Sequence, residues 1–214
     1  MKLKGFIFDL DGTLINSLPV VRTSLNTTLL KFSGRVYDDK EMSALFGPSE
    51  EGVFQKLFPD SWREALQYYL NEYDRIHEPY AKPFPGVVQT LTLLLERKMK
   101  LALVSGKGAR SMEISLRHSG LKQFFEVIIT GSEHQASKPE HIKQVLALWN
   151  FTPKEVVYVG DIAYDVQAAK EAGVLPISAL WAETAQIPKV LAMHPAFAFE
   201  NVESFRAWIM KTVQ

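Results

Sequence analysis

Two acidic residues, Asp9 and Asp11, stand two positions apart directly after a short apolar run near the start of the chain. The run, residues 5–8, has the composition of a strand that is buried on both faces. Unpaired carboxylates in such a place would carry a desolvation penalty on the order of several kcal/mol each, so we expect a metal ion, a hydrogen-bond network or a phosphorylated substrate beside them. The alternative is that Asp11 and Gly12 form only the turn that ends the strand.

The composition bounds the kinds of chemistry that these acids can take part in. The chain has 214 residues, of which 47% are hydrophobic and 22% charged, which excludes a disordered or fibrous protein. Lys plus Arg equals Asp plus Glu at 24 each, so no excess of positive charge indicates a nucleic-acid partner. There are no cysteines, and the five histidines lack zinc-ligand spacing, so a bound metal should have oxygen ligands.

The sequence contains neither an apolar segment of signal-peptide length nor one of about 20 residues that could span a membrane. We therefore expect a cytoplasmic protein with no membrane partner. The sequence makes no prediction of oligomeric state.

The elements that must position the acids follow from hydrophobic periodicity. Residues 17–81 show helical spacing throughout, whereas the chain beyond the proline-rich joint at 82–86 alternates between helices and short apolar strands. The alternation predicts an α/β fold, a doubly wound parallel sheet with helices on both faces. The all-helical block is then an insertion after the first strand, with residues 1–16 and 83–214 as the core and residues 17–82 as the inserted domain.

Individual elements can be assigned within this scheme. We expect inserted helices that begin near Ser17, at Asp38 in a capping box with Glu41, at Ser49 and at Asp60. The helix that begins at Asp38 is expected to stop at Gly47-Pro48. In the core we expect strands at 101–104, 127–129, 156–159 and around 177–180, with helices at 87–98, 109–118, 140–149 and 164–172.

Polar residues follow most of these strands, and ligands bind at the carboxyl ends of strands in such sheets. Ser105 follows the second strand and Asp161 the fourth, with Asp165 one helical turn beyond. Lys138 lies a short loop after the third strand. Read singly, each has a structural explanation: a helix cap for Ser105, a solvated side chain for Lys138, and capping or dipole-favoured acids for Asp161 and Asp165. Read together with Asp9 and Asp11, they indicate one site.

Oxygen ligands without His or Cys nearby favour Mg²⁺, which in proteins typically takes one or two carboxylates and a substrate phosphate oxygen. Asp9 and Asp161 are the natural carboxylate ligands. The remaining phosphate charge would be met by the Lys138 ammonium, the Ser105 hydroxyl and backbone N–H groups. These backbone groups belong to the segments around Asp11 and Ser105, namely Gly12, Thr13 and Gly106.

A carboxylate within reach of phosphorus can attack it, giving an aspartyl phosphate that divides one difficult displacement into two easier ones. We assign this role to Asp9. Asp11 would protonate the leaving oxygen and later deprotonate water, work that typically contributes about 100-fold to 10,000-fold in rate.

The motifs resemble those of the haloacid dehalogenase superfamily, in the same order and over the whole chain. The resemblance rests on Asp9-Leu10-Asp11-Gly12-Thr13-Leu14, Ser105 after a strand, Lys138-Pro139, and Gly160-Asp161 followed by Asp165. It implies a Rossmann-like core, a four-helix cap inserted after the first motif, and Mg²⁺ held by Asp9, the backbone carbonyl of Asp11 and Asp161, with Asp165 in support. One departure is that Ser105-Gly106-Lys107 stands where a Thr-Asn or Ser-Asn start is frequent.

Two segments resemble the phosphoglycolate phosphatase and bacterial pyrophosphatase branch of the superfamily, 14–17 and 46–50. The second contains Gly47-Pro48-Ser49, a turn into a helix N-terminus that would present N–H groups to a substrate carboxylate or second phosphate. A plain connection between helices explains the same residues. The expected substrate is a small phosphorylated metabolite, phosphoglycolate or alternatively pyrophosphate or a sugar phosphate.

Three other functions are weighed against this interpretation. A dehalogenase would have no use for Asp11. A β-phosphoglucomutase-like phosphomutase uses the same acid pair but carries a His on the first cap segment, whereas no His occurs here between Thr13 and His77. A non-enzymatic binding module would be expected to have lost Asp9 or Asp161, and both are present.

Overall fold

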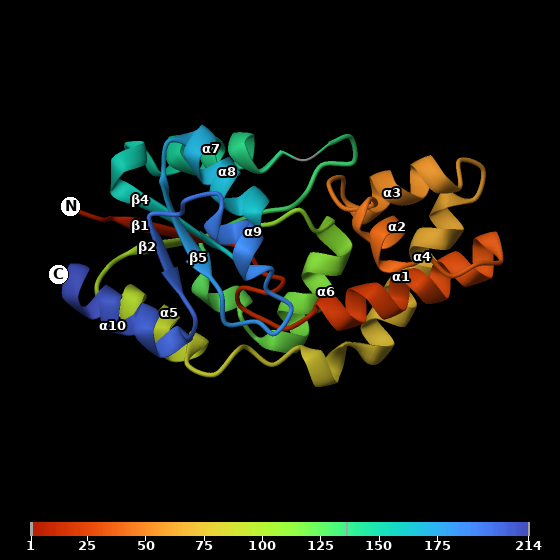
Figure 1. The fold of residues 1–214 in the computed structure, drawn as a ribbon, viewed down its shortest axis with the longest axis horizontal. Helices are drawn as coiled ribbons and strands as arrows, with labels where there is room; N and C mark the ends of the chain where they lie inside the picture. Colours follow the sequence, from red (N-terminus) through yellow and green to blue (C-terminus); the bar gives the residue numbers. More distant parts are fainter. Residues whose placement is uncertain (1, 136, 214) are drawn as a thin grey trace.

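A parallel β-sheet forms the centre of the computed structural model, which describes residues 2–135 and 137–213 (Figure 1). Its strand order is β3-β2-β1-β4-β5-β6, and all neighbouring strands pair in parallel. The strands are β1 (Gly5–Phe8), β2 (Lys100–Val104), β3 (Val127–Ile129), β4 (Val156–Gly160), β5 (Leu175–Ala179) and β6 (Phe197–Phe199). The order reverses between β1 and β4, so the loops after these two strands diverge and leave a crevice for a ligand.

Helices cover both faces of the sheet, as the sequence predicts. Alternate residues of β1 serve the two faces: Phe6 and Phe8 pack in one hydrophobic cluster, and Ile7 packs in the other. The first cluster is covered by α5 (Val87–Glu96), α6 (Ala109–Ser119) and α10 (Val202–Thr212), and the second by α7 (Lys138–Trp149) and α8 (Ala163–Ala172). The prediction of a doubly wound core is confirmed.

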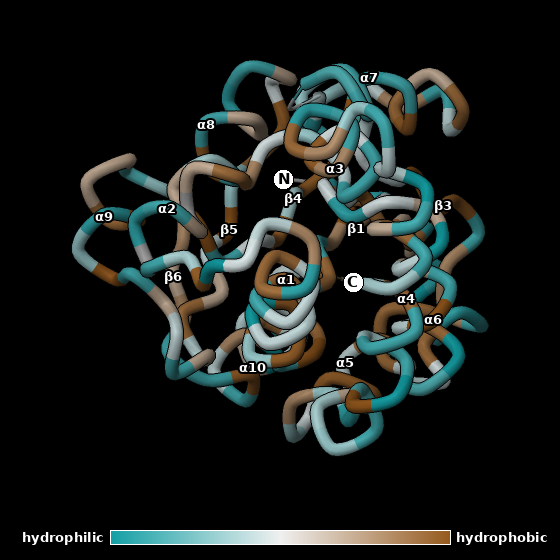
Figure 2. Tube along the Cα trace, turned by 90° about the vertical axis from the view of Figure 1, so that its right-hand side faces the viewer, coloured by the Kyte–Doolittle hydropathy of each residue, from teal (hydrophilic) through white to brown (hydrophobic). Residues whose placement is uncertain are grey.

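Four helices between β1 and α5 form a cap with its own core, seen at the right of Figure 1. They are α1 (Leu18–Ser33), α2 (Asp39–Ser43), α3 (Glu50–Leu57) and α4 (Trp62–His77). Leu25, Phe54, Tyr69 and Tyr73 are buried among them. Figure 2 views α1 nearly along its axis and shows both hydrophobic and hydrophilic residues on its turns, as an amphipathic helix requires. The domain boundary at 17–82 stays a prediction.

The expected capping box opens α2, but the helix is shorter than predicted. The Glu41 backbone N–H donates to Asp38 Oδ1 (2.8 Å), and the Asp38 N–H donates to Glu41 Oε2 (3.0 Å). The helix ends at Ser43 instead of reaching Gly47. The following residues, including Leu45 and Phe46, instead form a loop that lines the cavity between cap and core.

Three elements that the sequence did not predict follow β5, and one of them, β6, extends the sheet. The strand β6 pairs with β5, and α10 begins after Asn201, whose side-chain oxygen accepts from the Ser204 N–H (2.8 Å). The short helix α9 (Ile187–Leu191) lies between β5 and β6. The signal for α10 was present in the helical spacing of its buried residues Val202, Phe205 and Ile209.

The two chain segments that connect cap and core lie side by side. Ile15 forms β-bridges with Asp11 and with Pro83, and the Phe84 N–H donates to the Leu14 carbonyl (3.0 Å). The cap thus leaves and rejoins the core at one place, next to the strand that carries Asp9. Across the described ranges, no helix is long and apolar enough to cross a membrane.

Candidate active site

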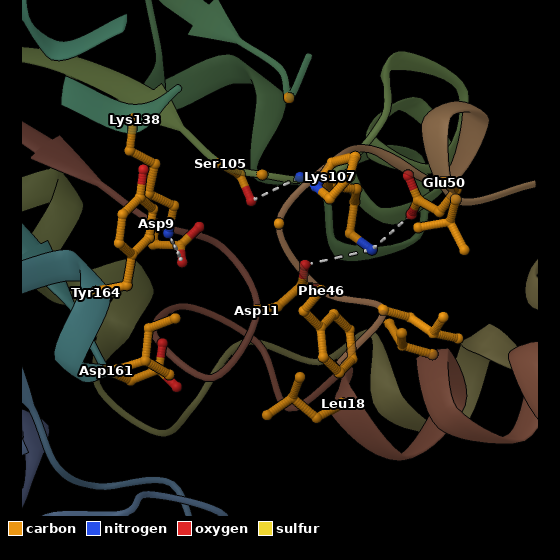
Figure 3. A pocket seen from close by; sticks show the side chains of 18 of the residues that line it. Asp9, Asp11, Leu18, Phe46, Glu50, Ser105, Lys107, Lys138, Asp161 and Tyr164 are labelled. Carbon is orange, nitrogen blue, oxygen red and sulfur yellow. Dashed lines mark hydrogen bonds and ion pairs between the residues drawn. The ribbon is translucent and has the colours of Figure 1, made fainter. Parts of the chain in front are cut away.

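Side chains from three strand ends meet at the carboxyl edge of the sheet, as predicted (Figure 3). Asp9 follows β1, Asp161 follows β4, and Ser105 follows β2. Because β1 lies between β2 and β4, one crevice receives all three side chains.

Three buried carboxylates, Asp9, Asp161 and Asp165, offer oxygens that all lie within 4.8 Å of one another. Lys138, at the first turn of α7, places its ammonium among them. Its Nζ donates to Asp9 Oδ2 (2.6 Å) and to Asp165 Oδ1 (2.5 Å). The sequence also allowed Lys138 to be a solvated side chain, but the structure places it buried in the acid cluster.

The charge of this cluster is unbalanced. Burial raises the pKa of Asp161 well above its usual range, and the neighbouring Asp165 and Asp9 carboxylates raise it further. Lys138 has a raised pKa although burial opposes its charge, because Asp165 and Asp9 stabilise the ammonium. One ammonium against three carboxylates leaves about two negative charges, which a divalent cation with oxygen ligands would neutralise. Asp9, Asp161 and Asp165 therefore fit Mg²⁺.

Gly12 and Thr13 contact the Asp161 carboxylate and position it in the acid cluster. Gly12 has a left-handed backbone (φ 79°), and a Cβ at this position would collide with the Asp161 carboxylate. The Thr13 hydroxyl donates to Asp161 Oδ1 (3.0 Å), while the Thr13 carbonyl accepts from Trp181 Nε1 (2.9 Å). Both residues thus fix the position of Asp161.

Asp11 points away from the acid cluster and toward the cap. The Ser17 hydroxyl donates to Asp11 Oδ1, and Lys107 Nζ lies 3.3 Å from Asp11 Oδ2. Burial raises the pKa of Asp11, while Lys107 and Ser17 act in the opposite direction and lower it. A carboxyl group with a raised pKa is suited to hold a proton and pass it to a leaving group.

Lys107 is a second buried lysine of the site, and the sequence analysis did not predict it. Its ammonium donates to the Tyr73 hydroxyl (3.0 Å) and lies 3.9 Å from Glu50 Oε1, so two cap helices contact it. Burial opposes its charge, but Asp11, Tyr73 and Glu50 outweigh burial and raise the pKa of Lys107. The only sequence signal was a lysine two positions after Ser105, in a loop that follows a strand.

Glu50 joins the cap to the core. Its carboxylate accepts the Gly108 N–H (2.5 Å) and the Ser111 hydroxyl (2.7 Å). Gly108 is the residue before α6, so a cap carboxylate lies at the N-terminus of a core helix, where negative charge is favoured. This contact holds α3 and its preceding loop over the sheet edge.

The remaining residues predicted for the site lie in the loop after β2 and in the loop before α3. Ser105 and Gly106 line the cavity, and the Ser105 Oγ accepts the Lys107 N–H (3.4 Å). Gly47 and Pro48 line it from the cap. Ser49 is buried, and its N–H donates to the Ser132 carbonyl (2.8 Å) and so is already partnered. The catalytic and binding roles assigned to all these residues stay predictions.

The cavity between cap and core has a volume of about 440 Å³, within the usual range for small-molecule sites. Asp9, Asp11, Ser105, Lys107, Lys138 and Asp161 all line it. Three carboxylates, one hydroxyl and two ammonium groups thus converge on one space. The arrangement suits the transfer of a phosphoryl group to a carboxylate.

Comparison with known proteins supports the same chemistry. Residues 6–179 match the family model described as haloacid dehalogenase-like hydrolase. Among curated proteins, pyrophosphatase PpaX of Listeria welshimeri is 31% identical over 211 residues, which cover 96% of each chain. Pyrophosphatase PpaX of Bacillus mycoides is 29% identical over 183 residues, or 85% of each chain.

Among solved structures, a predicted phosphatase from Clostridium acetobutylicum has a TM-score of 0.79 at 20% identity and covers 99% of this chain and 100% of its own. A predicted phosphoglycolate phosphatase from Haemophilus somnus has a TM-score of 0.77 at 22% identity, covering 100% and 99%. A putative β-phosphoglucomutase from Thermotoga maritima has a TM-score of 0.75 at 22% identity, covering 98% and 100%. At these identities the likeness is one of fold.

Proposed function

Because the chain belongs to the haloacid dehalogenase-like hydrolase family, we propose that it is a Mg²⁺-dependent phosphatase that uses Asp9 as its nucleophile. The observation that carries the proposal is the contact of Asp9 with the Lys138 ammonium inside the cluster formed with Asp161 and Asp165, while Asp11 lines the same cavity. The substrate is a small phosphorylated metabolite.

The first half-reaction transfers the phosphoryl group to the protein. A carboxylate oxygen of Asp9 attacks phosphorus, the bond from phosphorus to the leaving oxygen breaks, and Asp11 donates its proton to that oxygen. Lys138 and Ser105 bind the non-bridging phosphate oxygens. Asp9, Asp161 and the Asp11 carbonyl, with Asp165 in support, would hold Mg²⁺, which would supply positive charge to stabilise the transferred phosphoryl group.

The second half-reaction releases inorganic phosphate. Asp11, now deprotonated, accepts a proton from water as the water oxygen attacks phosphorus, and the bond to Asp9 breaks. Asp9 and Asp11 return to their starting protonation states. Cap closure through Glu50 would exclude water other than the attacking molecule.

Two compact anions are the first substrates to test. The resemblance of segments 14–17 and 46–50 to phosphoglycolate phosphatases supports phosphoglycolate. The names of the curated relatives, which are pyrophosphatases, support pyrophosphate as a second candidate.

The proposal is tested by a substrate panel with purified protein, comprising phosphoglycolate, pyrophosphate, sugar phosphates, nucleotides and simple phosphate esters, each with and without Mg²⁺. We expect Mg²⁺-dependent release of phosphate and a loss of at least about 1,000-fold in Asp9→Asn, because the amide cannot act as the nucleophile. Asp60→Asn, on an exposed residue of the cap, is the matched control and should retain activity. Hydrolysis of no compound, or equal turnover by Asp9→Asn, contradicts the proposal.

A further inference from the structure

The part of the cavity beyond Asp11 is apolar. Figure 3 shows Leu18 and Phe46 on the Asp11 side of the pocket, and Lys138 and Asp161 on the other side. Because Asp11 faces the leaving oxygen in the proposed reaction, the space next to it receives the leaving group. The character of this space therefore indicates the substrate class.

Six apolar cap residues line this part of the cavity: Leu18, Val21, Leu25, Leu45, Phe46 and Val53. The first three occupy one face of α1 at helical spacing. Phe46, a large aromatic residue, is 49% exposed and lines the cavity. An apolar group bound here would remove this surface from water, which is favourable in proportion to the area covered.

The charges next to this wall do not favour a second anionic group. Lys138 is paired with Asp9 and Asp165, and Lys107 lies between the carboxylates of Asp11 and Glu50. A carboxylate or second phosphate on the leaving group would approach the Glu50 carboxylate and the apolar wall together.

Arg22, half-buried on α1, and the exposed Lys189 also line the cavity. Their positive charge would attract an anionic phosphate ester from solvent.

We propose that the preferred substrates are phosphate monoesters of apolar alcohols, in which the alcohol portion packs against the cap wall. The inference rests on the proposed phosphatase function. In the reaction the ester oxygen takes the Asp11 proton and leaves as a neutral alcohol, and water supplies the oxygen that remains on phosphate. The cavity of about 440 Å³ has room for a larger group than the compact anions phosphoglycolate and pyrophosphate fill.

The test uses ethyl, butyl and hexyl phosphate, whose leaving alcohols differ in apolar length but not in charge or intrinsic reactivity. We expect kcat/KM to rise about threefold per methylene, or roughly 80-fold from ethyl to hexyl phosphate. Hexyl phosphate should also exceed both phosphoglycolate and pyrophosphate. A flat series, or a preference for either compact anion, overturns the inference but leaves the phosphatase proposal standing.

Phe46→Ser tests the wall directly and should reduce the hexyl-to-ethyl ratio of kcat/KM by about tenfold, because the apolar surface that contacts the longer chain is lost. The matched control is Leu30→Ser, which removes an exposed apolar side chain from α1 outside the cavity and should leave the ratio unchanged. Equal ratios in the two variants overturn the inference.

A binding measurement separates this inference from the proposed function. Hexylphosphonate and ethylphosphonate, which are not hydrolysed, are titrated into the protein with Mg²⁺ by calorimetry. Tighter binding of hexylphosphonate by tenfold or more, with a more negative heat-capacity change, supports the apolar wall even if no ester is turned over. Equal affinities overturn the inference even if esters are hydrolysed.

Discussion

At the scale of single residues, the site divides into an acid cluster around Lys138 and an ion pair formed by Asp11 and Lys107. Lys138 neutralises part of the charge on Asp9 and Asp165. Lys107 does the same for Asp11. In the proposed reaction, Lys138 would act on the side of the transferred phosphoryl group and Lys107 on the side of the leaving group.

Lys107→Met should change the pH dependence of turnover. Burial raises the pKa of Asp11 and Lys107 lowers it, so removing the ammonium raises the Asp11 pKa further. Asp11 must be deprotonated to accept a proton from water, and the acidic limb of the kcat profile should therefore move to higher pH. We expect kcat at pH 7 to fall by about tenfold or more.

Lys107→Arg is the control for this measurement, because it keeps a positive charge beside Asp11. Its acidic limb should stay closer to that of the unsubstituted protein. Acidic limbs at the same pH in the Met and Arg variants would show that the charge of Lys107 does not act on Asp11.

Most residues of this site could be located from the sequence because they directly follow predicted strands. Asp9, Ser105 and Asp161 follow apolar strands, and the parallel sheet brings such positions together whatever the details of packing. Lys107 and Glu50 were missed because their contacts arise only when the cap lies on the core. No local pattern in the sequence indicates the contact between cap and core.

At the scale of elements, the cap helix α4 is the main contact between cap and core beside the catalytic edge. The Tyr73 hydroxyl contacts both Lys107 and the Ser115 hydroxyl of α6 (2.9 Å). One turn later His77 is fully buried, with its ring 4.6 Å from that of Tyr73 and 5.3 Å from that of His118. The α4 helix therefore carries an uncharged imidazole at the contact between cap and core.

His77 should make the fold sensitive to acid. Burial is the largest effect and lowers the pKa of His77 to about 4, with a further contribution from Lys107, against 6.5 for an ordinary histidine. Between pH 6.5 and 4 the unfolded chain binds a proton at His77 that the folded chain does not. The free energy of unfolding should therefore fall by up to about 1.4 kcal/mol per pH unit in this range, with no contribution from His77 above pH 6.5.

The measurement is urea unfolding between pH 4.5 and 7.5 for the unsubstituted protein and for His77→Phe. The variant keeps a ring against Tyr73 but cannot titrate, so its loss of stability with falling pH should be smaller. His118 and Asp74, which are hydrogen-bonded nearby (2.6 Å), are present in both proteins. An equal acid dependence in the two proteins would rule out His77 as its source.

Helices and strands were predicted correctly where hydrophobic periodicity was strong. They were not predicted where contacts with other parts of the fold determine the structure. The capping box at Asp38 was predicted, but the end of α2 was not, because the loop beyond it borders the cavity instead of continuing the helix. The strand β6 has only three residues, too few to show alternation, and depends on pairing with β5.

At the scale of the whole molecule, we expect metal binding and stability to be coupled through the acid cluster. Asp9, Asp161 and Asp165 are buried close together with one lysine, so their mutual repulsion opposes folding, and a bound cation would neutralise it. A cation that binds only the folded chain stabilises it by about 2.7 kcal/mol at 100 times its dissociation constant.

Mg²⁺ should therefore raise the melting temperature by about 5 to 10 °C at saturation, measured by calorimetry against protein in a chelator. Asp161→Ala should lose most of this increase, while Asp60→Ala, an exposed acid on the cap, should keep it. An undiminished Mg²⁺ effect in Asp161→Ala would remove Asp161 from the ligand set.

In the proposed reaction, the residues at the sheet edge would carry out phosphoryl transfer and the cap would select the leaving group. The position of the cap between β1 and α5 could be inferred from the change of periodicity, whereas the apolar wall opposite Asp11 depends on how α1 and the loop before α3 face the sheet. The hydrolase family and the place of the insertion could therefore be predicted from the sequence, and the shape of the cavity could not.

The account depends most directly on phosphorylation of Asp9. Protein mixed with the best substrate of the panel and Mg²⁺ is quenched in acid within milliseconds and digested, and its peptides are analysed by mass spectrometry. We predict one phosphoryl group on the peptide that contains Asp9, present transiently in the unsubstituted protein and absent from Asp9→Asn. Phosphorylation of a different residue, or turnover in which no phosphorylated peptide forms at any time, would contradict the account.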